Sequence, residues 1–274
     1  MDEQLYLAGL GLSLPEKVEK AIATFRHYEP EALKFDPRGY RVGDSFGKDS
    51  CALLELCRMA GVKYWAAHSL TTLDAPETIY FGRKYHPKTV IERSPSGMTL
   101  LSMLANIKTT LPTRGRRWCC SIYKEYRNGL VNAFGIRATE SNSRRNWKIW
   151  SPHIETKDWT LNPILYWSED NIWQFLRKNN VPYCSLYDEG FKRLGCVGCP
   201  MSNNRRKEFE RWPRYEKAWR KSVAQYWERL HNAKRRDGEY YHCHKFKSAD
   251  DLWSWWMEEM PKEDKGDECQ MGLF

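Results

Sequence analysis

The sequence predicts an α/β fold with a doubly wound, mostly parallel sheet, followed by a helical C-terminal region. Short β-prone runs alternate with helical patterns between residues 37 and 154, which is the spacing of β-α-β units. A turn of small residues at 41–50 joins the first of these strands to the first of these helices. From about Ser168 the pattern becomes mostly helical, charged and rich in tryptophan. The first segment therefore predicts the sheet and the second a helical addition to it.

The composition is that of a globular chain with a preference for anionic partners. Its 274 residues are 41% hydrophobic and 29% charged, with a formal net charge of +9. This charge favours nucleotides, sulfate-bearing substrates or nucleic acid. No apolar run is long enough to cross a bilayer and no secretory signal pattern begins the chain, so a cytoplasmic protein without membrane contact is expected. Because cytoplasmic thiols are normally reduced, the nine cysteines indicate metal or redox chemistry more than disulfides.

The elements follow one another at short intervals along the chain. Residues 1–36 are expected to form a helical arm, in which Pro15 begins an amphipathic run. After the strand that precedes the turn, further strands are expected at 63–70, 90–93, 130–137 and 148–154. Helices are expected from the turn to about residue 60, and at 76–86, 98–107 and 168–178, with another that opens at Trp118. Residues 183–200 are expected to form a loop, and residues 203–260 are expected to be mostly helical.

The turn Ser45-Phe46-Gly47-Lys48-Asp49-Ser50 is a candidate phosphate site. Gly47 lets the main chain bend sharply, so that backbone N–H groups and the positive end of the next helix face one point. Ser45 and Ser50 add hydroxyl donors, Lys48 adds a positive charge, and Asp49 could hold a magnesium ion. The alternative is an ordinary strand-to-helix turn with a solvated lysine, because short glycine motifs recur by chance.

The predicted organisation has three parts: an arm at 1–36, a nucleotide-binding domain at 37–200 that includes a cysteine loop, and a helical region with a charged tail at 201–274. In a doubly wound sheet, ligands bind beyond the carboxyl ends of the strands. The loops that follow the predicted strands are therefore expected to converge on the site.

Two close cysteine pairs are candidate metal ligands. The spacing of Cys196-Val197-Gly198-Cys199 lets two thiolates reach one centre, and Cys119-Cys120 would be the second half. Taken alone, the first pair also fits a zinc knuckle or a redox dithiol. Cys184 is a fifth candidate, whereas Cys51 and Cys57 lie on an apolar helix and are expected to be packing residues. The alternative for the whole set is free cysteines in a reduced cell.

Several motifs, in order, resemble the phosphoadenosine phosphosulfate (PAPS) reductase family and the related PP-loop ATP pyrophosphatases. The turn at 45–50 resembles their PP-loop, and residues 135–141 with Arg144 resemble the family's second nucleotide signature. Trp118-Cys119-Cys120 with Lys124 is similar to the paired-cysteine helix of the cluster-containing members. The stretches 162–170, 186–190 and 193–196 match the later half of the family. Several motifs in the right order are a strong signal.

The resemblance implies a Rossmann-like fold of the adenine nucleotide alpha-hydrolase type that binds ATP or a sulfonucleotide, with Mg²⁺ if the ligand is ATP. Phe46 stands where the pyrophosphatases usually have glycine, whereas Lys48 and Asp49 are retained. The nucleotide residues implied are Ser45, Phe46, Gly47, Lys48, Asp49, Ser50, Asp74, Gly135, Arg137 and Arg144. A [4Fe–4S] cluster would be held by Cys119, Cys120, Cys196 and Cys199, with Cys184 as an alternative to one of the adjacent pair. Zinc in place of the cluster stays open.

The end of the chain, Glu268-Cys269-Gln270-Met271-Gly272-Leu273-Phe274, resembles two different motifs. As a degenerate form of the reductases' Glu-Cys-Gly-Leu-His it makes Cys269 the nucleophile, although it has an insertion and no histidine. Residues 270–274 also resemble the peptide by which bacterial DNA-processing proteins dock on the sliding clamp, where an apolar pair enters a groove. A tail without a role is the third alternative.

Three functions follow from these motifs. The first, which is slightly favoured, is ATP-dependent, pyrophosphate-releasing sulfur transfer to a nucleic-acid acceptor, with Lys48 and Asp49 as catalytic residues and a cysteine desulfurase as a candidate sulfur source. The second is a sulfonucleotide reductase that produces sulfite through Cys269, with a thiol donor such as thioredoxin. The third is a basic nucleic-acid-binding module in which the cluster is structural, and it leaves the nucleotide motifs without a purpose.

Overall fold

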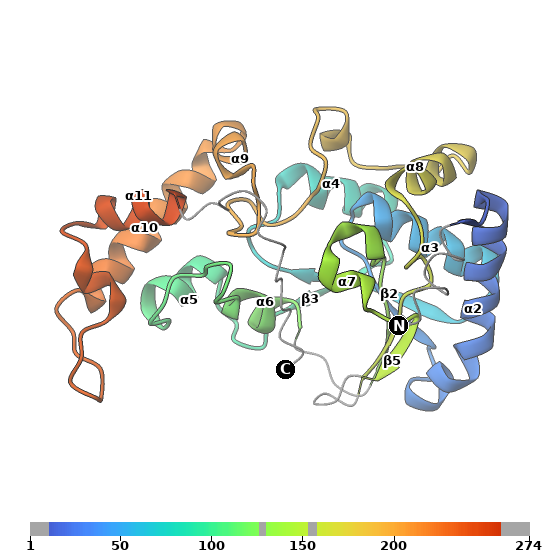
Figure 1. Ribbon diagram of the computed structural model, residues 1–274, viewed down its shortest axis with the longest axis horizontal. Helices are drawn as coiled ribbons and strands as arrows, with labels where there is room; N and C mark the ends of the chain where they lie inside the picture. Colours follow the sequence, from blue (N-terminus) through green and yellow to red (C-terminus); the bar gives the residue numbers. More distant parts are fainter. Residues whose placement is uncertain (1–10, 126–129, 153–157, 259–274) are drawn as a thin grey trace.

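The computed structural model describes residues 11–125, 130–152 and 158–258 of the chain (Figure 1). Its centre is a six-stranded sheet with the order β3-β2-β1-β4-β6-β5. All neighbouring strands are parallel except β5, which is antiparallel to β6 at the edge. The strands are β1 (Tyr40–Gly43), β2 (Tyr64–Leu70), β3 (Val90–Arg93), β4 (Val131–Ala133), β5 (Trp150–Pro152) and β6 (Trp159–Leu161).

The strand order confirms the predicted doubly wound sheet. The chain steps outward from β1 to β3 and then returns past β1 to place β4 on its other side. The outward connections are α3 (Lys48–Ala60) and α4 (Pro76–Tyr85), and the return path contains α5 (Leu100–Asn106) and α6 (Trp118–Tyr123). In Figure 1, α4 lies above the edge strand β3, and α5 and α6 lie to its left. The carboxyl ends of β1 and β4 are thus the point where the winding reverses, which is where such sheets bind ligands.

The long helix α2 (Leu14–Phe35) confirms the predicted N-terminal helix for the residues described. Pro15 lies in its first turn, and the Ser13 N–H donates to the Glu16 Oε2 at 2.7 Å. Its apolar face buries Ala21 and Phe25, and the Tyr40 hydroxyl donates to the Phe25 carbonyl at 2.7 Å. The helix is therefore fixed to the first residue of β1 and supports the central strand.

Helix α3 begins directly after Gly47 and ends at Gly61, which has the left-handed conformation (φ 69°) that a C-cap glycine adopts. Its buried face includes Cys51 and Cys57, so both are packing residues, as predicted. The strands on the β4 side of the sheet differ more from expectation. β4 is shorter than the predicted 130–137, because the chain leaves the sheet and forms the short helix η1 (Ala138–Glu140), and β6 was not predicted at all.

The C-terminal helices pack against α5 and are therefore in contact with the α/β part of the chain. They are α9 (Arg205–Arg211), α10 (Pro213–Leu230) and α11 (Ala249–Glu258). Arg229 of α10 donates to the carbonyls of Ala105, at 2.8 Å, and Lys108, at 2.6 Å. Between α10 and α11 the predicted helix is interrupted by a loop and the short helix η3 (His242–Lys245). Across the described ranges, no helix combines the length and apolar character needed to span a membrane.

Candidate functional site

The buried carboxylate of Asp44 organises the loop after β1. Its Oδ1 accepts from the Phe46 N–H at 3.0 Å and from the Ser50 hydroxyl at 3.2 Å. Its Oδ2 contacts His86 Nδ1 at 2.7 Å and accepts from the Thr89 hydroxyl at 2.8 Å. Asp44 is only 1% exposed. One buried carboxylate therefore shapes the loop from the side that faces the protein interior. The opposite side of the loop is left for a ligand.

Phe46, which replaces the glycine of the pyrophosphatases, has the positive φ angle of 60° that favours glycine. Its ring is buried and stacks on the His68 ring, with centroids 4.2 Å apart. Gly82 of α4 makes room for this ring, since a Cβ there would lie 2.4 Å from the Phe46 Cζ. Packing between β2 and α4 thus stabilises a backbone conformation that phenylalanine alone disfavours.

The first turn of α3 presents its N–H groups at the centre of the site. The Lys48 N–H donates to the Tyr187 hydroxyl at 3.0 Å, and the Gly47 N–H donates to the Ser45 Oγ at 3.4 Å. The Lys48 side chain is buried and its Nζ lies 3.5 Å from the Asp49 Oδ2 and 3.5 Å from the Glu169 Oε1. An oxygen therefore already occupies the helix N-terminus, the position that a phosphate oxygen takes in such loops.

The second loop of the site follows β4 and meets the first at close range. A Cβ at Gly135 would lie 3.0 Å from the Asp49 carbonyl carbon, so glycine permits this approach. The Arg137 Nε donates to the Asp49 Oδ1 at 2.6 Å, and its Nη2 lies 3.6 Å from Glu140. Arg144, in the short helix α7 (Asn142–Arg145), pairs with Glu140. The two arginines expected to face phosphate are thus brought to the site, and each is paired with a carboxylate.

Asp74 lies in the loop after β2 and connects the nucleotide loops with the cysteines. Its Oδ2 accepts from the Thr71 N–H and hydroxyl, both at 2.9 Å. Asp74 forms an isolated β-bridge with Cys196, and the Cys196 thiol donates to the Thr71 hydroxyl at 3.3 Å. The cysteine loop is therefore attached to the carboxyl end of β2.

The structure brings together the four cysteines predicted as cluster ligands. Cys119 has Cys120, Cys196 and Cys199 as electrostatic neighbours, although the two pairs lie far apart in the sequence. The Cys119 thiol donates to Cys120 and, with Lys124 and Arg117, lowers the pKa of Cys120 to about 5. Burial raises the pKa of Cys196 to about 11. A basic side chain contacts one of these thiols directly, since the Arg117 Nη2 lies 3.2 Å from the Cys120 Sγ.

The surroundings of these four thiols bear on the kind of metal group that they could hold. Within the described ranges, no three His, Cys, Asp or Glu side chains gather in the way one metal ion requires. A [4Fe–4S] cube binds each thiolate through a different iron, so its ligands stand farther apart. The cations Arg117 and Lys124 beside them match the negative charge that such a cluster carries with four thiolates.

Two further cysteines, Cys184 and Cys269, were also candidates for the chemistry of the site. Cys184 is buried and lies beside Cys51 and the Thr78 hydroxyl, at the junction of α3 and α4. Cys269 and the peptide at 270–274 lie outside the described residues.

Sequence reasoning missed several residues that shape the site. Asp44 directly precedes the predicted turn. Its carboxylate could have been predicted to accept hydrogen bonds from the turn, because a buried acid beside a glycine turn needs hydrogen-bond donors. His86, Glu169 and Tyr187 reach the turn from distant segments, and no local pattern indicates such contacts.

Comparison with known proteins agrees with this geometry. The model of the phosphoadenosine phosphosulfate reductase domain family matches residues 41–202. An adenosine 5'-phosphosulfate reductase of Staphylococcus haemolyticus is 27% identical over 184 residues, which are 63% of this chain and 76% of that protein. A protein of the same name from Oceanobacillus iheyensis is 26% identical, over 57% of this chain and 68% of that protein.

Among solved structures, the phosphoadenylyl-sulfate reductase of Candida auris in a phosphate complex covers 71% of this chain and 93% of its own. It is 16% identical, with a TM-score of 0.48. The family match extends from Arg41 in β1 to Ser202, just beyond the cysteine loop. It therefore includes both phosphate-site loops and all four grouped cysteines, over more than half of the chain. The chain belongs to the phosphoadenosine phosphosulfate reductase domain family.

Proposed function

We propose that the protein cleaves ATP in a Mg²⁺-dependent site, releases pyrophosphate and activates an acceptor for sulfur transfer. The observation that carries this proposal is the alternation of cations and carboxylates where the loops after β1 and β4 meet. Lys48, Arg137 and Arg144 are each paired with a carboxylate, from Asp49, Glu140 or Glu169. A bare phosphosulfate favours a site with an excess of cations, whereas carboxylates beside a phosphate cradle suit a triphosphate that carries Mg²⁺.

The residues of the two loops have separate roles in this proposal. Lys48 and Arg137 neutralise the triphosphate, and the Ser45 hydroxyl, 3.3 Å from that of Ser50, donates to its oxygens. Asp49 and Glu140 fit Mg²⁺, because this ion takes one or two carboxylates together with phosphate oxygens. When bound, Mg²⁺ would neutralise charge on the phosphates of the nucleotide.

The proposed reaction has two displacements. An acceptor oxygen attacks the α-phosphorus of ATP, the bond from that phosphorus to the bridging oxygen breaks, and pyrophosphate leaves with the electron pair. A sulfur nucleophile then attacks the acceptor atom that bears the adenylated oxygen, and AMP leaves. The net charge of +9 supports a nucleic acid as acceptor. The proposed source of sulfur is the persulfide of a cysteine desulfurase, which a thiol reduces to the attacking hydrosulfide while forming a disulfide.

A [4Fe–4S] cluster on Cys119, Cys120, Cys196 and Cys199 is part of the same proposal. Bound there, it would supply an iron–sulfur centre next to the nucleotide loop, since Cys196 is bridged to Asp74. Iron and acid-labile sulfide, measured after anaerobic purification, are expected at about four each per chain. A preparation that holds zinc and no iron would overturn this assignment.

Pyrophosphate release tests the main proposal. With ATP, Mg²⁺, single-stranded nucleic acid and a sulfur donor, we expect pyrophosphate to form. Asp49→Asn should lower its rate at least about 100-fold, the loss typical for a residue that positions transition-state charge. Asp170→Asn removes an exposed carboxylate from the nearby first turn of α8 (Glu169–Lys178) and is the matched control, with an unchanged rate. Equal rates for the two variants would contradict the proposal.

The names of the curated relatives favour one second candidate, reduction of a sulfonucleotide. In that reaction the Cys269 thiolate attacks the sulfur of adenosine phosphosulfate or PAPS, the nucleotide leaves, and a thiol donor such as thioredoxin releases sulfite. Sulfite formed from a sulfonucleotide, without pyrophosphate from ATP, would replace the first proposal by this one. Under it, Cys269→Ser should abolish sulfite formation.

A further inference from the structure

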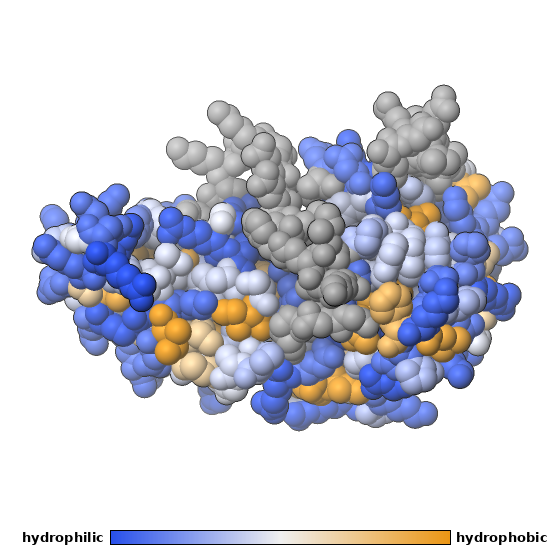
Figure 2. Space-filling view, turned by 90° about the horizontal axis from the view of Figure 1, so that it is seen from below, coloured by the Kyte–Doolittle hydropathy of each residue, from blue (hydrophilic) through white to orange (hydrophobic). Residues whose placement is uncertain are grey.

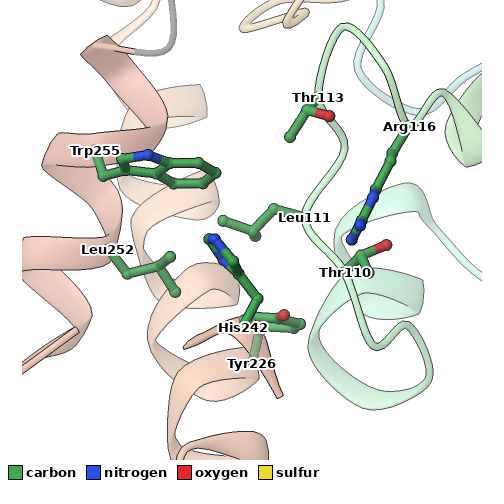
Figure 3. A pocket seen from close by; sticks show the side chains of 8 residues that line it. All are labelled: Thr110, Leu111, Thr113, Arg116, Tyr226, His242, Leu252 and Trp255. Atoms are coloured by element: carbon green, nitrogen blue, oxygen red, sulfur yellow. The ribbon is translucent and has the colours of Figure 1, made fainter. Parts of the chain in front are cut away.

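A second cavity lies outside the phosphate site, between the loop that connects α5 with α6 and the C-terminal helices. Figure 3 shows Trp255 of α11, His242 of η3 and Tyr226 of α10 on one side, and Arg116 with Thr110 and Thr113 of the loop on the other. Its volume is about 210 Å³. None of these residues takes part in the chemistry proposed above.

The walls of this cavity are held in place by hydrogen bonds that cross it. The Tyr226 hydroxyl donates to the Thr109 carbonyl at 3.0 Å, and the Trp256 Nε1 donates to the Pro112 carbonyl at 2.8 Å. The loop is thus fixed to α10 at one end and to α11 at the other. A cavity fixed in this way exists before any ligand binds, so little ordering is required on binding.

The lining combines flat rings with donors for an anion. Trp255 contacts the His242 ring on one side, with centroids 5.0 Å apart, and turns its indole toward the cavity in Figure 3. Arg116 is exposed and forms no ion pair within the described part of the chain. Burial, Lys245 and Arg116 lower the pKa of His242, so its ring is neutral near pH 7 and can pair with a polar edge. Rings beside a guanidinium suit one planar base and an adjacent phosphate.

The loop at 231–241 joins α10 to η3, the two elements that contribute Tyr226 and His242 to the cavity. It carries Lys234, Arg235 and Arg236 together with Asp237 and Glu239; Arg235 pairs with Asp237, and a bridge between Lys234 and Tyr240 closes the loop. The Tyr240 ring is 43% exposed and stacks on the His244 ring at 3.9 Å. Residues 201–258 contain 14 Lys and Arg against nine Asp and Glu. Figure 2 shows hydrophilic side chains gathered over the end of the molecule formed by these helices.

We propose that this cavity and the loop at 231–241 form a binding site for single-stranded nucleic acid, in which one unpaired base enters the cavity and stacks on Trp255. Arg116 contacts the phosphate beside that base, and the basic loop follows the strand onward. The cavity is smaller than typical cofactor pockets of about 300–1,000 Å³, so it holds one ring system rather than a whole dinucleotide. The proposal names the acceptor class of the proposed sulfur transfer and in that respect rests on it.

Fluorescence anisotropy with labelled single-stranded DNA and RNA of about 15 nucleotides tests the site, as such strands span a typical binding groove. Trp255→Leu should weaken binding about tenfold or more, and Trp255→Phe should retain most of the affinity, because a ring restores stacking. Arg116→Ala should weaken binding and reduce the magnitude of the slope of log K against the logarithm of the salt concentration by about one. Arg83→Ala, which removes an exposed arginine on α4, is the control with unchanged affinity.

A strand of the same length without bases separates base recognition from simple charge attraction. Wild-type protein should bind it about tenfold more weakly than the normal strand, and Trp255→Leu should bind both strands alike. Equal binding of the two strands by the wild type, or unchanged affinity of Arg116→Ala and Trp255→Leu, would overturn the proposal. Thermal unfolding verifies that each variant is folded. The assay contains neither ATP nor a sulfur donor, so its outcome is independent of pyrophosphate release.

Discussion

Asp44 and Asp49 stand five residues apart in the same loop and have opposite roles. Asp44 is fully buried and satisfies donors from Phe46, Ser50 and Thr89 together with the His86 ring. Asp49 is 20% exposed at its side chain and pairs with cations that face the site. The first carboxylate builds the loop, and the second is available to a ligand.

Replacing Asp44 by alanine should unfold the loop and destabilise the whole chain. Several buried donors would lose their acceptor, and each unsatisfied group costs about 1–3 kcal/mol, so we expect a loss of about 3 kcal/mol or more in the free energy of unfolding. Thr89→Val removes only one donor and should cost about 1 kcal/mol. Urea denaturation measures both. Asp49→Asn should leave the unfolding free energy within about 1 kcal/mol, because the amide keeps an oxygen that can accept from the Arg137 Nε. A small effect of Asp44→Ala would show that the loop does not depend on this carboxylate.

At the scale of residues, the sequence predicted those features that depend on residues close together in the chain. Ser45, Gly47, Lys48 and Ser50 form a phosphate-type turn because a local pattern of glycine and hydroxyls encodes it. The pairing of Arg137 with Asp49 joins residues 88 positions apart. Such pairs depend on strand order, which the sequence pattern does not specify. For the same reason the sequence left Cys184 open as a ligand, whereas the fold places it beside Cys51.

Among the elements, α9 has the clearest link to the cysteine loop. The Glu208 Oε2 accepts from the Gly198 N–H at 2.8 Å, and its Oε1 accepts from the Ser202 hydroxyl at 2.5 Å. Gly198 has a positive φ of 79°, and a Cβ there would lie 2.5 Å from the Phe209 ring. The turn between Cys196 and Cys199 is therefore shaped by contacts with α9.

Loss of the contact between Glu208 and Gly198 should reduce cluster binding and leave the fold of the sheet unchanged. Glu208→Ala leaves the Gly198 N–H without its acceptor, so we expect the turn to loosen and the iron content after anaerobic reconstitution to fall at least about tenfold, as for other residues that orient metal ligands. Glu210→Ala changes an exposed carboxylate on the same helix and should retain the iron of the wild type. Circular dichroism of the apo-protein should be the same for both. Full iron content in Glu208→Ala would show that α9 does not orient the turn.

The regular elements were predictable where the pattern was long, and less so for the short strands beyond β1. The end of α3 was predicted, because Gly61 follows its apolar pattern. β6 has only three residues, Trp159 to Leu161, and pairs with β4 and β5 in opposite directions. Three residues are too few to show an alternating pattern, so only the tertiary structure defines this strand.

Across the whole molecule, the helices beyond the family match share a core with the family domain. Trp219 of α10 is buried and its Nε1 donates to the Val197 carbonyl at 3.0 Å, inside the cysteine turn. The buried Arg205 donates to the Trp256 carbonyl at 2.8 Å and lies over the Trp256 ring. The Trp256 Nε1 in turn donates to the Pro112 carbonyl, in the loop before α6. Helix α6 carries Cys119 and Cys120. Both cysteine pairs are therefore supported by the C-terminal helices.

Truncation tests this dependence and separates the two candidate reactions. A chain of residues 1–202 should lack a cooperative thermal transition, because it exposes the apolar surface that Trp219 and Trp256 cover. A chain of residues 1–258 keeps every described contact and should unfold within a few degrees of the full chain, as expected for a change of less than about 1 kcal/mol. The second truncation also removes Cys269. Under ATP-dependent sulfur transfer it should release pyrophosphate at the rate of the full chain, whereas under sulfonucleotide reduction it should form no sulfite. A stable chain of residues 1–202 would show instead that the predicted boundary near residue 200 separates independent domains.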